Sequence, residues 1–332
     1  MKIKIYFVEK TISFDSSDIS SSSIAGSEKT LINITNELAK DENLIIKVFN
    51  NIDNEKTMNK VQWININRIN DSDIPDYLIA MSDANLLSLF NCKKKYLWSH
   101  SVQPIEKFIR KKQLIPFIKN KPVMLLEGSY HYETRSFFTS LFGKKIISIA
   151  PDYDFIETKI NKEFIPPKKA IFTTRSDRNL MFLLDSWKKI STLCSNSSLY
   201  INPPFNLTSD YKNFGINLRV KGDKSVLINE LINSRVMLNP GHKGEVFCLA
   251  AEEARELCLP IVTMGYGSLK ERVDHGVTGY IAKNKEEFIK YSVKILSDDD
   301  LYLKLKNNLF SKKGSRTYKG VVTDLLKILY EN

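Results

Sequence analysis

Two glutamates in the C-terminal half, Glu245 and Glu253, are of a residue type that can accept hydrogen bonds from the hydroxyl groups of a ligand. The stretch around them predicts a turn-rich loop over 239–245, a helix that begins near Val246, and a strand opened by Pro260. The first N–H groups of a helix have no partner within it, so they can bind an anion or hydroxyl groups. From spacing alone, ordinary first-turn and mid-helix glutamates remain the simpler interpretation.

The order of residues in this stretch resembles the Glu-x7-Glu signature of family 4 retaining glycosyltransferases, which have the GT-B fold. The residues in register with that signature are Pro240, Glu245, Phe247, Leu249, Glu253, Ala254, Pro260 and Val262. The residues that match its sequel are Gly267, Glu271, Asp274, Gly276, Val277, Thr278 and Gly279. The resemblance implies that Glu253 binds the ribose of a nucleotide-sugar donor. It implies that the transferred sugar is held by Glu245 and by the backbone of Val246, Phe247, Cys248 and Leu249.

Shorter matches extend the resemblance over most of the chain. Gly26 resembles a glycine at the start of the family's first helix, where it would contact the donor. Arg175 and Arg178 resemble the cations that grip the donor diphosphate, and arginine can pair with phosphate bidentately. His100 matches a cleft histidine near the reacting carbon of the donor. The resemblance therefore implies His100 and Glu245 as catalytic residues.

The chain also departs from the family pattern. Val246 and Cys248 replace two glycines of the donor loop, and Cys258 replaces a third one before the strand opened by Pro260. Glycine allows a backbone to approach a ligand closely and to adopt positive φ. These replacements leave the fold assignment intact, but they leave open the donor's identity and, to a lesser degree, activity.

The elements that must position these residues alternate as short apolar runs and longer amphipathic ones. This rhythm predicts an α/β protein of two Rossmann-like βαβ domains, facing across a cleft as in GT-B proteins. We expect residues 1–155 to bind the acceptor and residues 156–332 the nucleotide sugar, with the last helix packing back on the first domain. Helix starts are predicted at Asn284, with Glu287 three residues on, and at Ser297, with Asp300 three residues on.

The composition is globular, with 42% hydrophobic and 26% charged residues. No apolar run is long enough to cross a bilayer, and the charged N-terminus is unlike a signal peptide, so we expect a cytoplasmic protein. The four cysteines and four histidines show no metal-ligand spacing. No Asp-x-Asp motif stands in a convincing place, so we expect no metal or cofactor beyond the nucleotide-sugar co-substrate.

Basic residues are concentrated between Lys93 and Lys145 in a chain of net charge +11. Within this region Ile105–Lys119 interleaves apolar and basic side chains, which suits an anionic membrane surface. An equally open alternative is a helix packed on the N-terminal sheet with its lysines solvated. Membrane docking would suit a glycolipid, diacylglycerol or lipid-linked or surface-polysaccharide acceptor, with the protein peripheral at the inner face of the cell membrane. No nucleic-acid motif accompanies the charge, so nucleic acid is not an expected partner.

Taken with the resemblance, these features predict a retaining transferase that moves a hexose-type sugar from a nucleotide diphosphate donor, with a UDP-sugar favoured. The alternative is a non-catalytic protein of the same fold that binds nucleotide sugars or anionic surfaces. A glycoside hydrolase needs two carboxylates around one scissile bond. Glu245 and Glu253 fit that role poorly, because the resemblance places them on different parts of the donor.

Overall fold

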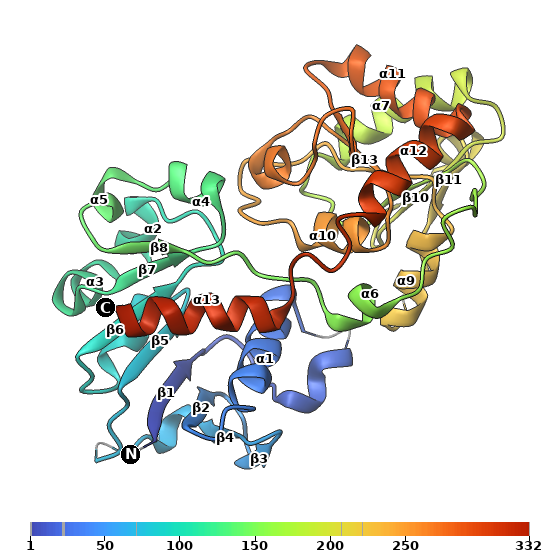
Figure 1. Cartoon of the computed structure of the whole chain (residues 1–332). Coiled ribbons are helices and arrows are strands. Elements are labelled where there is room, and N and C mark those ends of the chain that lie inside the picture. The colour runs from blue at the N-terminus through green and yellow to red at the C-terminus, as the bar shows by residue number, and fades with distance from the viewer. Residues whose placement is uncertain (1, 22–23, 71, 207, 221, 332) are drawn as a thin grey trace. The chain divides into compact units, whose positions relative to one another are not determined.

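The computed structural model describes residues 2–21, 24–70, 72–206, 208–220 and 222–331 (Figure 1). The chain forms two compact units, one of residues 1–150 and 318–332 and one of residues 151–317. The division lies before Pro151 rather than after residue 155 as expected. Lys224 explains the difference, because its ammonium pairs with Asp152 at 2.8 Å and Asp154 at 2.7 Å and ties this segment to the second unit.

The first unit is built on a sheet whose described strands follow the order β3-β4-β2-β1-β5-β6-β7-β8. All neighbours are parallel except β3 and β4. The strands are β1 (Ile3–Val8), β2 (Leu44–Asn50), β3 (Lys56–Met58), β4 (Val61–Asn65), β5 (Tyr77–Met81), β6 (Lys94–Trp98), β7 (Val123–Leu126) and β8 (Lys144–Ile146). The central strands are nearly continuous apolar runs, as a parallel sheet covered on both faces requires.

Short helices surround this sheet. They are η1 (Ser16–Ser20), α1 (Gly26–Leu38), η2 (Ile66–Arg68), η3 (Ala84–Ser88), α2 (Ile105–Arg110), α3 (Leu114–Asn120), α4 (Ser129–Glu133), α5 (Phe137–Ser140) and the C-terminal α13 (Tyr318–Glu331). The last helix packs beside α1 (Figure 1). The segment Ile105–Lys119 is divided between α2 and α3, because Lys112 adopts φ 53° between them.

The second unit has a parallel sheet of order β11-β10-β9-β12-β13-β14 among its described residues. Its strands are β9 (Lys169–Phe172), β10 (Ser198–Ile201), β11 (Ile216–Leu218), β12 (Val236–Leu238), β13 (Ile261–Thr263) and β14 (Gly279–Ile281). Its helices are α6 (Tyr153–Glu157), α7 (Leu180–Leu193), α8 (Ser209–Asn213), α9 (Lys224–Ile232), α10 (Leu249–Glu256), η4 (Gly267–Glu271), α11 (Lys285–Ser297) and α12 (Asp299–Phe310).

Alternating side chains of β9 build two separate cores in this unit. Ala170 and Phe172 pack with Trp187 of α7 and Phe288 of α11. Ile171, on the opposite face, packs with apolar residues of α9 and α10. The period of two along the strand therefore covers both faces with helices, which confirms the predicted α/β architecture.

The predicted helix starts can be compared with the caps observed. The Asn284 side chain accepts a hydrogen bond from the Glu287 N–H at 2.8 Å, which confirms the start of α11. The start of α12 is one residue later than predicted, because Asp298 rather than Ser297 caps it and accepts from the Leu301 N–H at 2.9 Å. Both caps satisfy N–H groups that lack partners within the helix.

Candidate functional site

Each sheet reverses its strand order beside its first strand. In the first unit β1 lies between β2 and β5, and in the second unit β9 lies between β10 and β12. Open parallel sheets bind ligands at such switch points, beyond the carboxyl ends of the strands. The candidate ligand-binding segments are therefore those after β1 and β5 and those after β9 and β12.

In the second unit, the loop after β9 presents two arginines. Arg175 is largely exposed and pairs with Asp177 through two nitrogens, at 3.0 and 2.5 Å. Arg178 is more buried, and its Nη1 lies 3.0 Å from Nδ1 of His242 in the loop after β12. The structure thus brings both predicted diphosphate-binding arginines to the switch point of this sheet.

The role of His242 in this contact follows from its neighbours. Its Nδ1 lies within hydrogen-bond distance of two donors, the Gly244 N–H at 3.0 Å and the Arg178 guanidinium at 3.0 Å. Both groups can only donate, so Nδ1 must be the acceptor and the ring must be neutral in this arrangement. His242 therefore fixes Arg178 by a hydrogen bond and leaves the positive charge of the guanidinium uncompensated by its ring.

Glu245 ends the same loop and is partly buried. Burial raises the pKa of its carboxyl group, although the Cys248 thiol and the positive charge of Arg178 oppose the shift. Its Oε2 is buried and has no hydrogen-bond partner among the described residues. A buried carboxylate oxygen without a partner is costly, so this atom is suited to accept a hydrogen bond from a ligand.

A glycine beneath the loop allows this placement. Gly267 adopts φ 69°, and a Cβ added to it would meet the backbone oxygens of His242 and Glu245. The next residue, Ser268, donates its N–H to the Glu245 carbonyl at 2.9 Å. The loop over 239–245 thus rests directly on the backbone of η4, where only glycine fits.

The helix after the loop begins later than predicted. α10 starts at Leu249 rather than near Val246, because Cys248 adopts the left-handed conformation with φ 63°. The side chains of Val246, Phe247 and Cys248 are buried, so their backbone is the part suited to meet a ligand. The Phe247 carbonyl already accepts from Arg272 Nε at 2.9 Å.

Glu253 lies further along α10 and is half-buried. Its neighbour Glu252 is buried and pairs with Arg255 at 2.5 Å and Arg272 at 3.2 Å. The pair with Arg272 was not predicted, because Arg272 reaches α10 from a distant part of the sequence.

In the first unit, Gly26 opens α1 beside the end of β1, and His100 follows β6. Nδ1 of His100 lies 2.5 Å from Oε1 of the buried Glu127, which follows β7, and the ring stacks on Trp98. Nε2 of His100 is buried without a hydrogen-bond partner among the described residues. Glu127 therefore orients the ring, and Nε2 is left for a ligand.

His131, which sequence reasoning missed, holds the backbone of Glu127. Its Nδ1 accepts the Glu127 N–H at 3.2 Å, and its Nε2 faces the Ser101 carbonyl oxygen at 3.2 Å. Burial lowers the pKa of His131 to about 4, so it is neutral at physiological pH. A signal for this group was present in the sequence, because Glu127 directly follows a buried strand, β7, and His100 likewise lies just after the buried strand β6.

Comparisons with known proteins bear on the fold and on the site. No curated protein matches the chain in sequence. Residues 204–312 match the family model described as Glycosyl transferases group 1. HepE from Anabaena, solved with UDP, is similar in structure, with 13% identity, a TM-score of 0.70 and coverage of 99% of this chain and 100% of that one. The chain has the GT-B fold.

Two further GT-B structures support this assignment. One is WaaG, a glycosyltransferase involved in lipopolysaccharide biosynthesis, with 12% identity, a TM-score of 0.69 and coverage of 99% and 100%. The other is sucrose-phosphate synthase from Thermosynechococcus elongatus, with 11% identity, a TM-score of 0.69 and coverage of 99% of both chains. The loop and helix that carry Glu245 and Glu253 lie within the segment matched by the family model.

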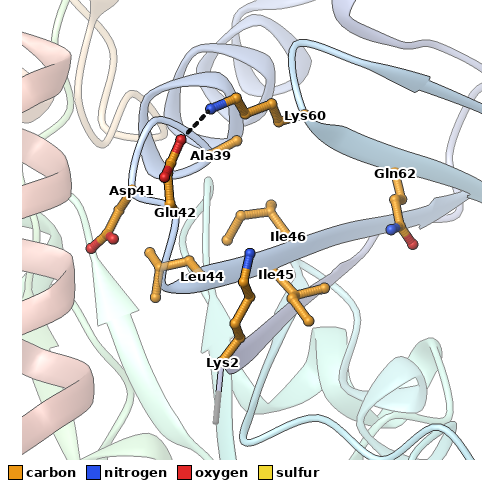
Figure 2. Close-up of a pocket in the computed structure, with 9 residues that line it drawn as sticks. All are labelled: Lys2, Ala39, Asp41, Glu42, Leu44, Ile45, Ile46, Lys60 and Gln62. Atoms are coloured by element: carbon orange, nitrogen blue, oxygen red, sulfur yellow. Dashed lines mark hydrogen bonds and ion pairs between the residues drawn. The ribbon is translucent and has the colours of Figure 1, made fainter.

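The first unit also has a pocket away from the carboxyl ends of its strands. It measures about 380 Å³ and is lined by residues at the amino ends of β1, β2 and β4, including Lys60 and Glu42, which pair at 3.4 Å (Figure 2). Parallel sheets bind ligands beyond the carboxyl ends of their strands, and this pocket lies at the amino ends. Size alone therefore does not make this pocket the functional one.

Within the described parts of the chain, no cluster of three or more His, Cys, Asp or Glu side chains could hold a metal ion. No helix in those parts combines the length and apolar character needed to span a bilayer.

Proposed function

We propose that the chain is a retaining glycosyltransferase that moves a hexose-type sugar from a UDP-sugar to a saccharide or lipid acceptor. One arrangement carries the proposal: two arginines and the unpartnered carboxylate oxygen of Glu245 share the switch point of the second unit. The match over 204–312 and the similarity to a fold that holds UDP in HepE support it.

Each residue has a proposed role that follows from its chemistry. Arg175 and Arg178 neutralise the diphosphate as negative charge builds on the leaving group. Glu245 accepts a hydroxyl group of the transferred sugar. Glu253 accepts the ribose hydroxyls, as the family resemblance implies. His100, held by Glu127, orients a sugar hydroxyl group through Nε2.

A non-catalytic nucleotide-sugar-binding protein is the second candidate. The replacement of glycines by Val246, Cys248 and Cys258 favours it, but two of these positions keep the conformation that glycine adopts most easily. Cys248 has φ 63° and Cys258 has φ 55°. The path of the backbone therefore does not require loss of the donor site.

Release of free nucleotide from UDP-, GDP- and ADP-sugars separates the two candidates. We expect slow release of UDP in water and faster release when an acceptor is present, with Arg178→Ala as the inactive comparison. Binding of UDP without any release across acceptors would favour the non-catalytic candidate. Failure of every nucleotide to bind would contradict both.

We further propose that the acceptor is presented at an anionic membrane surface. Four apolar side chains in the basic region are strongly exposed: Ile109 at 59%, Ile115 at 78%, Phe137 at 82% and Leu141 at 69%. They belong to α2, α3, α5 and the residue that ends α5. Exposed apolar groups surrounded by lysines and arginines suit the interface of a bilayer that carries negative charge.

An aromatic cluster holds these helices together. The ring of Phe117 in α3 lies 4.9 Å from Phe108 in α2 and 5.5 Å from Phe138 in α5, measured between ring centroids. The three helices therefore share one aromatic cluster. Figure 1 shows α2, α3 and α5 at the same end of the sheet. The exposed apolar side chains therefore belong to one packed substructure.

A further inference from the structure

A small pocket lies at the switch point of the first sheet. It is formed by residues that follow β1 and β5, by the start of α1 and by His100 after β6. Its polar lining consists of Glu9, Thr11, Ser27, Glu28, Ser82 and His100. It therefore occupies the position in this sheet that the arginine loop occupies in the sheet of the second unit.

The size of the pocket limits what it can take. Its volume is about 50 Å³. A site for one water molecule needs roughly 10–15 Å³ of such space, so the pocket takes a few small groups of a ligand rather than a whole sugar ring. A hydroxyl-bearing or amino-bearing arm of a larger molecule fits this description.

The charge of the lining limits the ligand further. Glu9 and Glu28 are buried, with 6% and 8% of their surface exposed. Among the described residues that line the pocket, none is a lysine or arginine. A phosphate or carboxylate placed here would face two carboxyl groups and no counter-charge, in contrast to the arginines of the second unit.

The hydrogen-bonding capacity of the lining is also one-sided. Glu9 accepts the Thr11 N–H at 2.7 Å and also the Thr11 hydroxyl, and Glu28 accepts the Ser27 hydroxyl at 2.8 Å. The hydroxyl groups of Thr11 and Ser27 are therefore already engaged as donors. Nδ1 of His100 faces Glu127, and its Nε2 is buried and has no partner among the described residues. Each carboxyl oxygen can accept more than one hydrogen bond, so the buried Glu9 and Glu28 favour a ligand group that donates.

We propose that this pocket receives a hydroxyl-bearing or amino-bearing arm of a saccharide and rejects saccharides that carry phosphate or carboxylate. That the ligand is a saccharide rests on the proposed function. The preference for a donor group without negative charge rests on the lining itself. Because the first unit is the one expected to bind the acceptor, we assign the arm to the acceptor, whose reacting end is then a neutral sugar or an amino sugar.

Three matched sugars test the proposal: glucose, glucosamine and glucose 6-phosphate, titrated into the full chain without donor and followed by saturation-transfer NMR. A charge anywhere on a hexose lies within one Debye length, about 8–10 Å, of the pocket carboxyl groups, so the test does not depend on which arm enters. We expect glucosamine to bind best, and glucose 6-phosphate to bind roughly tenfold more weakly than glucose.

Two variants assign the binding to the pocket. Glu28→Gln should reduce the advantage of glucosamine and the penalty on glucose 6-phosphate. Glu42→Gln lies in the pocket at the amino ends of the strands of the same sheet (Figure 2). It should change neither the advantage of glucosamine nor the penalty on glucose 6-phosphate. Equal or tighter binding of glucose 6-phosphate in the parent, an unchanged order in Glu28→Gln, or no binding of any sugar would overturn the proposal.

Addition of UDP and UDP-glucose to the same samples separates this proposal from the proposed function. If the sugars follow the expected order while neither nucleotide binds, the pocket stands and the transferase proposal falls. If UDP-glucose displaces glucosamine whereas UDP does not, the arm in the pocket belongs to the donor sugar, which overturns the assignment to the acceptor.

Discussion

At the scale of single residues, Glu245 combines burial with an unpartnered oxygen, and this predicts a pH-dependent cost to stability. Its folded-state pKa is raised, so the contribution of Glu245 to stability is fully present below the ordinary pKa of 4.5 and is lost as the pH rises through the folded-state value. Glu245→Gln should therefore gain stability relative to the parent as the pH rises above 4.5. Urea unfolding across pH measures the difference, and a constant difference would contradict the prediction.

The same carboxylate should act on turnover more than on nucleotide affinity. Glu245→Gln should lower kcat by roughly tenfold or more, about 1.4 kcal/mol of transition-state stabilisation, with little change in the Kd for UDP. Glu253→Ala should show the opposite pattern and weaken UDP binding. Calorimetry with UDP and nucleotide-release rates give both quantities. If both variants behave like the parent, the two glutamates do not form the proposed donor site.

Cys258 offers a residue-scale test of backbone strain outside the loop. It is buried and has φ 55°, where a Cβ costs about 1–2 kcal/mol. Cys258→Gly should therefore unfold at a higher temperature than Cys258→Ala, the reverse of the usual order at helix or strand positions. Thermal unfolding followed by circular dichroism compares them. A lower melting temperature for the glycine variant would show that lost packing outweighs the relief of strain.

At the scale of elements, the contact between η4 and the donor loop can be tested with two glycines of similar backbone conformation. Gly267→Ala places a Cβ against the backbone oxygens of His242 and Glu245, whereas Gly276→Ala, with φ 77°, meets nothing within 4 Å. Both variants bear the left-handed strain of about 1–2 kcal/mol, but only Gly267→Ala must move the loop. We expect a larger loss of stability and of UDP affinity for Gly267→Ala. Equal losses in the two variants would argue against support of the loop by η4.

The same elements show what the sequence could and could not predict. The alternation of apolar runs predicted both sheets, and the loop between β12 and α10 was located because its glutamates, glycines and prolines occur in a recognisable order. The late start of α10 was missed because a left-handed Cys248 has no propensity signal. The partners Glu127 and Arg272 were missed because their contacts join residues distant in sequence, which only the fold brings together.

At the scale of the whole molecule, the basic region and the exposed apolar side chains of α2, α3 and α5 predict reversible binding to anionic membranes. Each basic side chain near such a surface contributes about 1 kcal/mol, and burial of a Phe or Leu side chain adds about 1.5–3 kcal/mol. Co-sedimentation of the full chain with vesicles of anionic and of neutral phospholipid measures the binding. We expect attachment to the anionic vesicles that weakens at high salt, because surface attraction is screened over a Debye length of about 8–10 Å near physiological salt.

Two sets of variants separate the contributions of charge and apolar contact to this binding. Replacement of Arg110, Lys111 and Lys112 by Glu should abolish attachment without lowering the melting temperature, because these side chains are exposed. Phe137→Ser combined with Leu141→Ser should weaken the attachment that persists at high salt. The matched control replaces Met181 and Leu193 by Ser, since these side chains of the second unit are also exposed, at 61% and 59%. If this control loses as much binding, or if the parent binds neutral vesicles equally well, the surface formed by α2, α3 and α5 is not the docking surface.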